Sequence, residues 1–449
     1  MSSPATDESI DPSAVPSVRT ILHLSVSALA VLVAEPLYLM EDLAVVGRLG
    51  AVALAALGVG SLILGVVSTQ LTFLSYGTTA RSSRLFGRGD RTGAVAEGIA
   101  ASWIAVVVGL VIVGVMQVIA PWVVGVIAPS GGVSGEATGW VRIAVCGVPL
   151  ILLSMAGNGW MRGVQDTRRP VVYVAVGLGV SAVICPLLVH GLLGFPDMGL
   201  HGSAVANLVG QSISGLLFAQ RLLAERSSTG LRPRWATIRA QLALARDLIV
   251  RSLSFQVCFL SAAAVAARFG VASLAAHQLV LQLWNFVSLL LDSLAIAAQS
   301  LVGAALGAKA IPGAIGVARR VTVLSVAASL GLVALFAAGQ PVLARIFTDD
   351  RDVLDAVVTP WWFFVAMLPV AGVVFALDGV LLGGGDAAYL RTTTVVCALV
   401  GFLPMIWASL AFDWGLAGIW TGLCLFMLFR LVALVARMST GRWTAIELR

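Results

Sequence analysis

The chain has 449 residues, of which 59% are hydrophobic and only 11% are charged. Soluble globular domains carry roughly 25% charged residues, so this composition excludes an aqueous domain of useful size. Apolar blocks of about twenty residues recur to the end of the chain, and each is long enough to cross roughly 30 Å of hydrocarbon. We count twelve such blocks. The composition therefore predicts an all-α integral membrane protein that is not an enzyme.

The net charge of +6 would suit a nucleic-acid partner, but the placement of the basic residues argues against one. Lys and Arg fall in alternate loops, so the positive-inside rule accounts for the charge and puts both termini in the cytoplasm. On this topology the basic residues on the outer side are Arg48, Arg142, Arg268, Arg345 and Arg351. We therefore expect a monomeric, multi-pass protein of the plasma (inner) membrane, with the lipid bilayer and no nucleic acid as its partner.

The predicted elements follow one another with short loops. Residues 1–18 are polar and acidic and are expected to form a disordered cytoplasmic tail. Six spans then make an N-terminal lobe over residues 19–223. Residues 224–246 form a basic cytoplasmic linker whose second half looks amphipathic and is expected to lie along the membrane surface. Six further spans make a C-terminal lobe over residues 247–438, before a cytoplasmic tail at 439–449.

The twelve spans are expected near 19–46, 51–79, 95–119, 140–161, 171–193, 201–223, 247–268, 275–306, 317–338, 358–382, 391–411 and 416–437. Shifting the chain by about 220 residues reveals an internal repeat, because Arg48 and Gly50 fall on Arg268 and Gly270. The same register pairs Gly87 with Gly307, Pro149 with Pro369, Gly159 with Gly379, Gly163 with Gly383 and Asp166 with Asp386. We expect a duplicated six-span unit, folded as two pseudo-symmetric lobes in a V around a central cleft.

The first span carries three carboxylates and a proline. Glu35 and Asp42 are seven residues apart, or two helical turns, and Tyr38 shares their face, whereas Glu41 points elsewhere. A carboxyl held away from water favours its neutral form, so it can exchange a proton for a cation near neutral pH. We expect the pair to bind the coupling cation, and Pro36 to kink the helix so that protonation bends it. Burial against backbone donors is the structural alternative.

The eighth span has a polar face. Gln278, Asn285, Asp292 and Gln299 recur every seven residues, and Gln282 follows one turn after the first of them. Such a face is not tolerated by lipid. It either bonds to neighbouring helices or lines an aqueous cleft between the lobes, and the intramembrane carboxyl of Asp292 favours the cleft.

A further candidate, Asp378, lies in the tenth span, where the repeat places it on Asn158. Two related helices thus hold a polar group at one position, for transport or for a structural hydrogen bond. No Lys or Arg is expected in the hydrophobic middle of a span, so these acids should lack ion-pair partners. The predicted coupling residues are Glu35, Asp42, Asp292 and Asp378, and the predicted cleft lining is Tyr38, Gln70, Tyr76, Asn158, Gln278, Gln282, Asn285 and Gln299.

The five cysteines all fall in predicted spans, without metal-like spacing, so we interpret them as small apolar side chains. They are Cys146, Cys185, Cys258, Cys397 and Cys424. No disulfide framework, metal site or cofactor is expected. No nucleotide-binding motif appears either, so an ion gradient should supply the energy, with protons as the expected coupling ion and sodium as the open alternative.

Taken together, the residues around Glu35 and Asp42, and the run from Asp292 to Gln299, resemble the multidrug and toxic compound extrusion transporters. Within them the chain is most similar to the branch named after DNA-damage-inducible protein F. The resemblance extends over the chain after residue 18, and it implies twelve helices in two lobes and export driven by protons or sodium. It also implies that Asp42 is the acidic residue of helix 1. The branch often has Asn and Asp on helix 5, where this chain has Ser181 and Cys185.

We therefore expect a cation-coupled antiporter, most simply proton-coupled, that exports lipophilic organic cations or xenobiotics. The alternative of the same superfamily is a flippase for a lipid-linked precursor, or an exporter of organic acids. Both alternatives should place basic residues in the cleft. A third reading is a membrane scaffold or sensor in which the carboxylates are structural.

Overall fold

The structure of the chain is a computed structural model that describes residues 15–128, 131–225, 230 and 232–446. Over these ranges the chain is almost entirely helical and has no β-strand, which confirms the predicted all-α membrane class. Eleven helices are long and apolar enough to cross a membrane, and a bent pair makes a twelfth if it counts as one span. Parts of the expected tails and linker, namely residues 1–14, 226–229, 231 and 447–449, lie outside the described residues.

The N-terminal half contains eight helices and two short 3-10 turns within its described residues. These are α1 (Val18–Val46), η1 (Gly47–Leu49), α2 (Ala51–Leu71), α3 (Phe73–Gly87), α4 (Arg91–Ile127), α5 (Gly131–Val145), α6 (Val148–Gly163), α7 (Arg168–Val189), η2 (Leu192–Gly194) and α8 (Leu200–Ala224). A break at Thr72 divides the predicted second span into α2 and α3, and a 45° bend separates α5 from α6.

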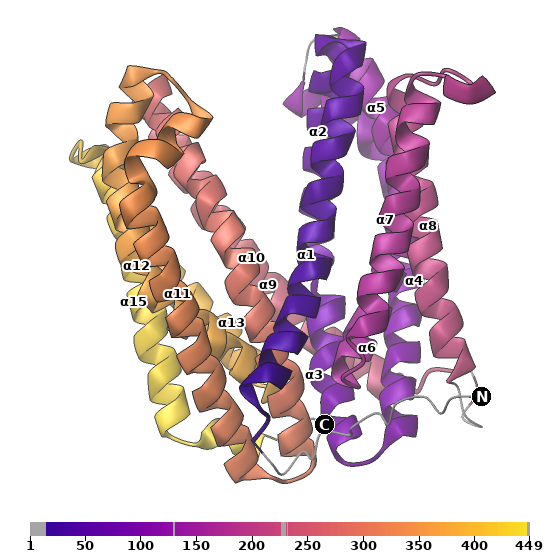
Figure 1. The fold of residues 1–449 in the computed structure, drawn as a ribbon, viewed down its shortest axis with the longest axis vertical. Helices are drawn as coiled ribbons and strands as arrows, with labels where there is room; N and C mark the ends of the chain where they lie inside the picture. Colours follow the sequence, from indigo (N-terminus) through magenta and orange to yellow (C-terminus); the bar gives the residue numbers. More distant parts are fainter. Residues whose placement is uncertain (1–14, 129–130, 226–229, 231, 447–449) are drawn as a thin grey trace.

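The C-terminal half repeats this plan with longer, less broken helices. These are α9 (Trp235–Arg268), α10 (Val271–Gly307), α11 (Ile311–Phe347), α12 (Arg351–Gly383), α13 (Ala387–Cys397), the π turn η3 (Ala398–Phe402), α14 (Leu403–Ala411), α15 (Gly415–Ser439) and the 3-10 turn η4 (Arg442–Ala445). Figure 1 shows the two halves as separate bundles that lie close together at the end where α1 begins and diverge toward the other end. The predicted two-lobe architecture is thus confirmed.

The predicted repeat is visible in the backbone. Gly50 and Gly270, which are 220 residues apart, precede α2 and α10 with φ of 114° and 107°, a conformation that glycine adopts without strain. Gly159 on α6 touches α3, since a Cβ there would lie 2.5 Å from the Ser75 carbonyl oxygen. Gly379 on α12 touches α10 in the same way, at 2.2 Å from the Ala295 carbonyl oxygen. Each lobe therefore has the same close helix pair at its centre.

The second half of the expected linker is not a separate surface segment. It belongs to α9, which begins at Trp235 and continues without interruption through the predicted seventh span. Gln241 is buried against the N-terminal lobe, where its Nε2 donates to the Glu97 carboxylate of α4 at 2.8 Å. Arg81 donates to the same carboxylate at 2.7 and 2.8 Å. A buried acid needs such donors, so this contact holds the start of α9 on the N-terminal lobe.

Helix α1 makes the reverse crossing. Just before it, the backbone oxygen of Pro16 accepts a hydrogen bond from Arg320 on α11 at 2.6 Å, and Val15 packs against Gly316 of the same helix. Farther along, α1 packs on α10, and its last turns pack on α7. The described end of the expected disordered tail is therefore docked on the C-terminal lobe, and α1 connects the two lobes.

Candidate functional site

A cavity of about 300 Å³ lies against the C-terminal lobe, between α9, α10, α12 and α15, with Thr72 and Tyr76 closing it from the N-terminal lobe. Aromatic rings form much of its wall: Phe255, Phe259, Trp284, Phe375 and Phe426. Asn285, Asp292 and Gln299 of the predicted polar face also line it. The expectation that the eighth span lines a cleft is met over this part of the helix. Apolar walls with a few polar groups are typical of a small-molecule site.

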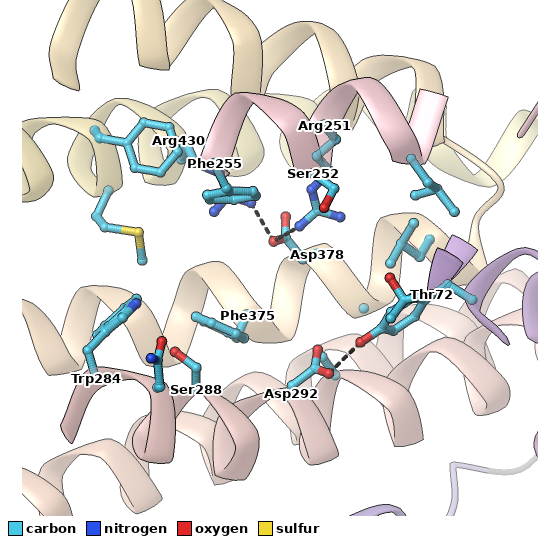
Figure 2. A pocket seen from close by; sticks show the side chains of 18 of the residues that line it. Thr72, Arg251, Ser252, Phe255, Trp284, Ser288, Asp292, Phe375, Asp378 and Arg430 are labelled. Atoms are coloured by element: carbon cyan, nitrogen blue, oxygen red, sulfur yellow. Dashed lines mark hydrogen bonds and ion pairs between the residues drawn. The ribbon is translucent and has the colours of Figure 1, made fainter. Parts of the chain in front are cut away.

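Two arginines line this cavity, which contradicts the expectation that the intramembrane acids lack ion-pair partners. Arg251 of α9 donates to the Asp378 carboxylate at 2.6 Å, and Arg430 of α15 donates to the same oxygen (Figure 2). The Arg430 side chain is only 3% exposed. Asp378 makes this burial tolerable, because each charge loses water but gains an ion pair. Asp378 is therefore ion-paired, and it is not the free carboxylate that the sequence predicted.

Asp292 is bonded differently. Its carboxylate accepts a hydrogen bond from the Tyr76 hydroxyl of α3 at 2.5 Å, across the boundary between the lobes. Gln299, seven residues further along α10, donates from Nε2 to the Tyr76 carbonyl oxygen at 2.7 Å. Tyr76 is thus held on both sides by one face of α10. The eighth span lines the cavity and bonds to a neighbouring helix at once, so both of its expected roles apply.

A second cavity, of about 190 Å³, lies inside the N-terminal lobe. Glu35, Asn158 and Arg162 line it, and Thr72 and Tyr76 separate it from the first cavity. Glu35 is an exposed residue that lines this space, whereas Asp42, two turns further along α1, is buried and does not line it. Several buried polar atoms of the wall have no hydrogen-bond partner among the described residues: Ser75 Oγ, Ser154 Oγ, Asn158 Oδ1 and Arg162 Nη2. The chamber is therefore polar enough to hold water or a polar guest.

Asp42 is buried away from both cavities, between α1, α7 and α8, and only 1% of it is exposed. The Cys185 thiol donates to its carboxylate at 3.3 Å, so this cysteine is a polar contact and not the apolar filler that we expected. Tyr38, Ser181 and Asn207 lie nearby, each with a polar atom lacking a hydrogen-bond partner in the described structure. None of the described Lys, Arg or His side chains forms an ion pair with Asp42.

The MatE family model matches this chain twice, at residues 28–187 and 248–407, which together make up well over half of the chain. The chain belongs to the MatE family. The two matches are offset by 220 residues, so they confirm the predicted duplication. This chain is therefore a multidrug and toxic compound extrusion (MATE) transporter.

Curated relatives cover this MATE transporter nearly from end to end. Protein DETOXIFICATION 44, chloroplastic, of Arabidopsis thaliana is 30% identical, over 98% of this chain and 86% of that protein. DNA damage-inducible protein F of Escherichia coli is 27% identical, over 96% and 94%.

Solved structures agree in fold. A MATE transporter in the bent conformation superposes with a TM-score of 0.86 at 20% identity, over 97% of this chain and 98% of the other. A MOP superfamily transporter from Pyrococcus furiosus, described as having a binding pocket of reverse polarity, superposes with a TM-score of 0.84 at 20% identity, over 96% and 95%.

The remaining predicted residues of this MATE transporter lie outside the two cavities. Gln278 and Gln282 are exposed, beyond the part of α10 that lines the larger cavity. Gln70 is half-buried, and its amide has no hydrogen-bond partner in the described structure. Tyr38 is buried beside Asp42. Glu35 and Asp42 therefore do not form one site, although they share a helix, because one opens to a cavity and the other packs on α7.

Three arginines were missed as site residues, namely Arg162, Arg251 and Arg430. The last two lie inside the predicted spans 247–268 and 416–437, and a basic residue inside a span is itself a functional signal. The positive-inside argument assigned them to the cytoplasmic side and overlooked this. Arg162 gave a weaker signal, because it stands at the expected end of its span. Pro36 stands inside α1, which remains one continuous helix, and a protonation-driven bend stays a prediction.

Proposed function

We propose that this MATE transporter is a proton-coupled antiporter that exports lipophilic organic cations across the plasma membrane. Asp42 carries the proposal. A dry carboxylate with no basic partner among the described residues is costly when charged, and a bound cation removes that cost. Tyr38, Ser181 and Asn207 also place oxygen atoms without hydrogen-bond partners beside this carboxylate, and hard cations prefer oxygen ligands, so the test below is made in sodium-free buffer.

The surroundings of the cavities support a cationic guest. Glu35 presents its carboxylate to the smaller cavity, and no described basic residue is ion-paired with it. In the larger cavity the carboxylate of Asp292 accepts a hydrogen bond from a neutral tyrosine hydroxyl and forms no salt bridge with a described basic side chain. The aromatic walls add faces on which a cation is attracted by the ring quadrupole.

The test is transport into liposomes that contain the purified protein. An acidic lumen in sodium-free buffer should drive uptake of a fluorescent organic cation such as ethidium, in exchange for protons. Asp42→Asn should abolish this uptake, because an amide cannot take up the proton. The matched control is Asp355→Asn, which neutralises an exposed acid on α12 and should leave uptake unchanged. Undiminished proton-driven uptake by the Asp42 variant would refute the assignment.

The organic-acid alternative has one specific observation in its favour. It requires basic residues in the cleft, and Arg251 and Arg430 line the larger cavity. The Nε atoms of both arginines have no hydrogen-bond partner within the described chain, so neither guanidinium is saturated by Asp378. A carboxylate or sulfonate guest in this cavity would meet the side chains of both arginines at its wall.

Two guests of equal length separate the candidates. One is a phenylalkyl trimethylammonium, and the other is the corresponding phenylalkyl sulfonate, so that only the head-group charge differs. The proposed function predicts proton-driven uptake of the ammonium compound. Uptake of the sulfonate alone, with loss of that uptake in Arg251→Gln, would establish the organic-acid alternative in its place.

A further inference from the structure

The two lobes are joined by a seam of contacts along the C-terminal half of α10, from Asp292 to Gly307. On the side of the N-terminal lobe the seam consists of α3 and the end of α6. Its polar contacts are the Tyr76 hydroxyl with Asp292 (2.5 Å), Gln299 with the Tyr76 carbonyl oxygen (2.7 Å), and the Ser300 hydroxyl with the Arg162 carbonyl oxygen (2.6 Å). All three α10 residues lie within three turns of that helix, so these hydrogen bonds form one continuous row between the lobes.

Nearer the C-terminal end of α10, the backbones of α3 and α10 touch at two glycines. A Cβ at Gly87 of α3 would lie 1.9 Å from the Ala304 carbonyl oxygen of α10. On the opposite side, a Cβ at Gly307 of α10 would lie 2.1 Å from the Arg84 carbonyl oxygen. Backbones this close leave no space for water between them. The lower part of the seam is therefore sealed by direct packing.

Arg84 fastens the far end of the seam. This buried arginine of α3 donates to the Gly384 carbonyl oxygen at 2.5 Å, to that of Gly383 at 3.4 Å, and to that of Ile446. The first two carbonyls end α12, where a helix leaves its last acceptors without intrahelical donors. A side chain from one lobe thus caps a helix of the other.

The Tyr76–Asp292 hydrogen bond differs from the rest of the seam because it faces the transport cavities. Both side chains line the larger cavity, and Tyr76 also lines the smaller one. Above Asp292, Asn285 of α10 faces the larger cavity. The bond is therefore the outermost contact of the seam, and a guest in either cavity reaches Tyr76.

We infer that Tyr76 and Asp292 are positioning residues for transport, and that their hydrogen bond holds the seam closed directly beneath the guest. An alternating transporter must open at this end in another step of its cycle, and that step requires the bond to break. A guest that competes for Asp292 or displaces the Tyr76 ring weakens the bond and thereby favours the change. The inference concerns the movement of the lobes and does not depend on the charge of the guest or on the coupling ion.

The experiment measures the distance between the diverging ends of the lobes. Spin labels are attached at Leu193 and Val271, two highly exposed positions near those ends, after the exposed Cys146 is replaced by Ser. Double electron–electron resonance then measures the distance between the labels. Tyr76→Phe removes only the hydroxyl. It should increase the population with closed outer ends about tenfold, the factor expected for loss of one hydrogen bond to a charged group.

The matched control is Tyr389→Phe, because the Tyr389 hydroxyl donates to the Ala433 carbonyl oxygen at 2.7 Å entirely within the C-terminal lobe. It should leave the distance distribution unchanged. Asp292→Ala should shift the distribution as Tyr76→Phe does, and the double variant should shift it no further. Additive shifts in the double variant, an unchanged distribution in Tyr76→Phe, or an equal shift in Tyr389→Phe would overturn the inference.

Discussion

In the N-terminal lobe the carboxylate of Asp42 is buried beside a thiol and neutral polar groups, whereas in the C-terminal lobe Asp378 is held between Arg251 and Arg430. The difference decides what each acid can do. A carboxylate between two guanidiniums balances two buried cations, which would be left unpaired without it. A carboxylate without such partners can gain and lose a proton. The scaffold is duplicated, but the ion-paired carboxylate of Asp378 has no counterpart at Asn158, the residue that the repeat places on it.

The repeat shows how the lobes came to differ. Shifted by 220 residues, Asp42 falls on Ala262, Asp378 on Asn158 and Arg251 on Val31. None of these three charges is present at the equivalent position of the other lobe, although the glycines that set the backbone are. Packing at a helix contact constrains both copies equally, while a charge is retained only where its partners are present.

The largest effect that would test this comparison is on stability in the C-terminal lobe. Arg430→Met should lower the free energy of unfolding by about 3 to 5 kcal/mol, because it breaks a buried ion-paired cluster from one side. Denaturation in detergent micelles measures the loss. The double variant Arg430→Met with Asp378→Asn should recover most of it. If the double variant were as unstable as the two losses combined, the charges would not be a coupled cluster.

A smaller effect should be equal in the two lobes. Gly159→Ala and Gly379→Ala each bring a methyl group within 2.5 Å of a backbone oxygen, so each should cost about 1 to 3 kcal/mol. Gly58 and Gly331 have no atom within 4 Å of the added Cβ and serve as controls, one for each lobe. Thermal unfolding compares the four variants. Clearly unequal costs for the first two would show that the duplicated helix contact has diverged.

Loss of the contact between Cys185 and Asp42 should matter less. Cys185→Ala removes one weak donor and should lower stability by about 1 kcal/mol, whereas Cys185→Ser retains a donor and should restore it. Thermal unfolding of both variants provides the measurement. An equal loss for both would mean that the cysteine acts by its volume, as first expected from the sequence.

The smallest change in stability is expected for Asp42 itself. Asp42→Asn breaks no ion pair among the described residues, so the free energy of unfolding should change by less than about 1 kcal/mol while proton-driven transport is lost. Measuring unfolding and liposome uptake on one preparation separates the two effects. A loss as large as that of Arg430→Met would reveal a structural role for this acid.

Much of the fold was predictable because its signals are local. Apolar length defined the spans, and the ungapped shift that joins Gly50 to Gly270 defined the repeat. The sequence did not predict that the linker continues into α9 and packs on the N-terminal lobe, because amphipathic character cannot distinguish a membrane surface from the surface of another helix. Gln241 makes that choice through Glu97, which lies 144 residues away in the chain.

The site was predictable only as a set of residue types. Glu35, Asp42, Asp292 and Asp378 could be identified because a carboxylate within a span is rare at any position. Their roles could not be assigned, because seven-residue spacing places Glu35 and Asp42 on one face without showing that neighbouring helices cover only the second. The contradiction over Arg251 and Arg430 has the same origin, since each is one isolated basic residue until Asp378 lies beside it.

By itself the sequence determined the membrane-protein class, the duplication and the identities of the intramembrane acids. Hydropathy, glycine positions and charge are properties of single residues or short segments, so they can be read without the tertiary structure. Only the tertiary structure decided which acid is ion-paired, which is dry and which bonds across the lobes. These properties depend on the distance to groups on other helices, and both the Coulomb energy and the access of water change over a few ångströms.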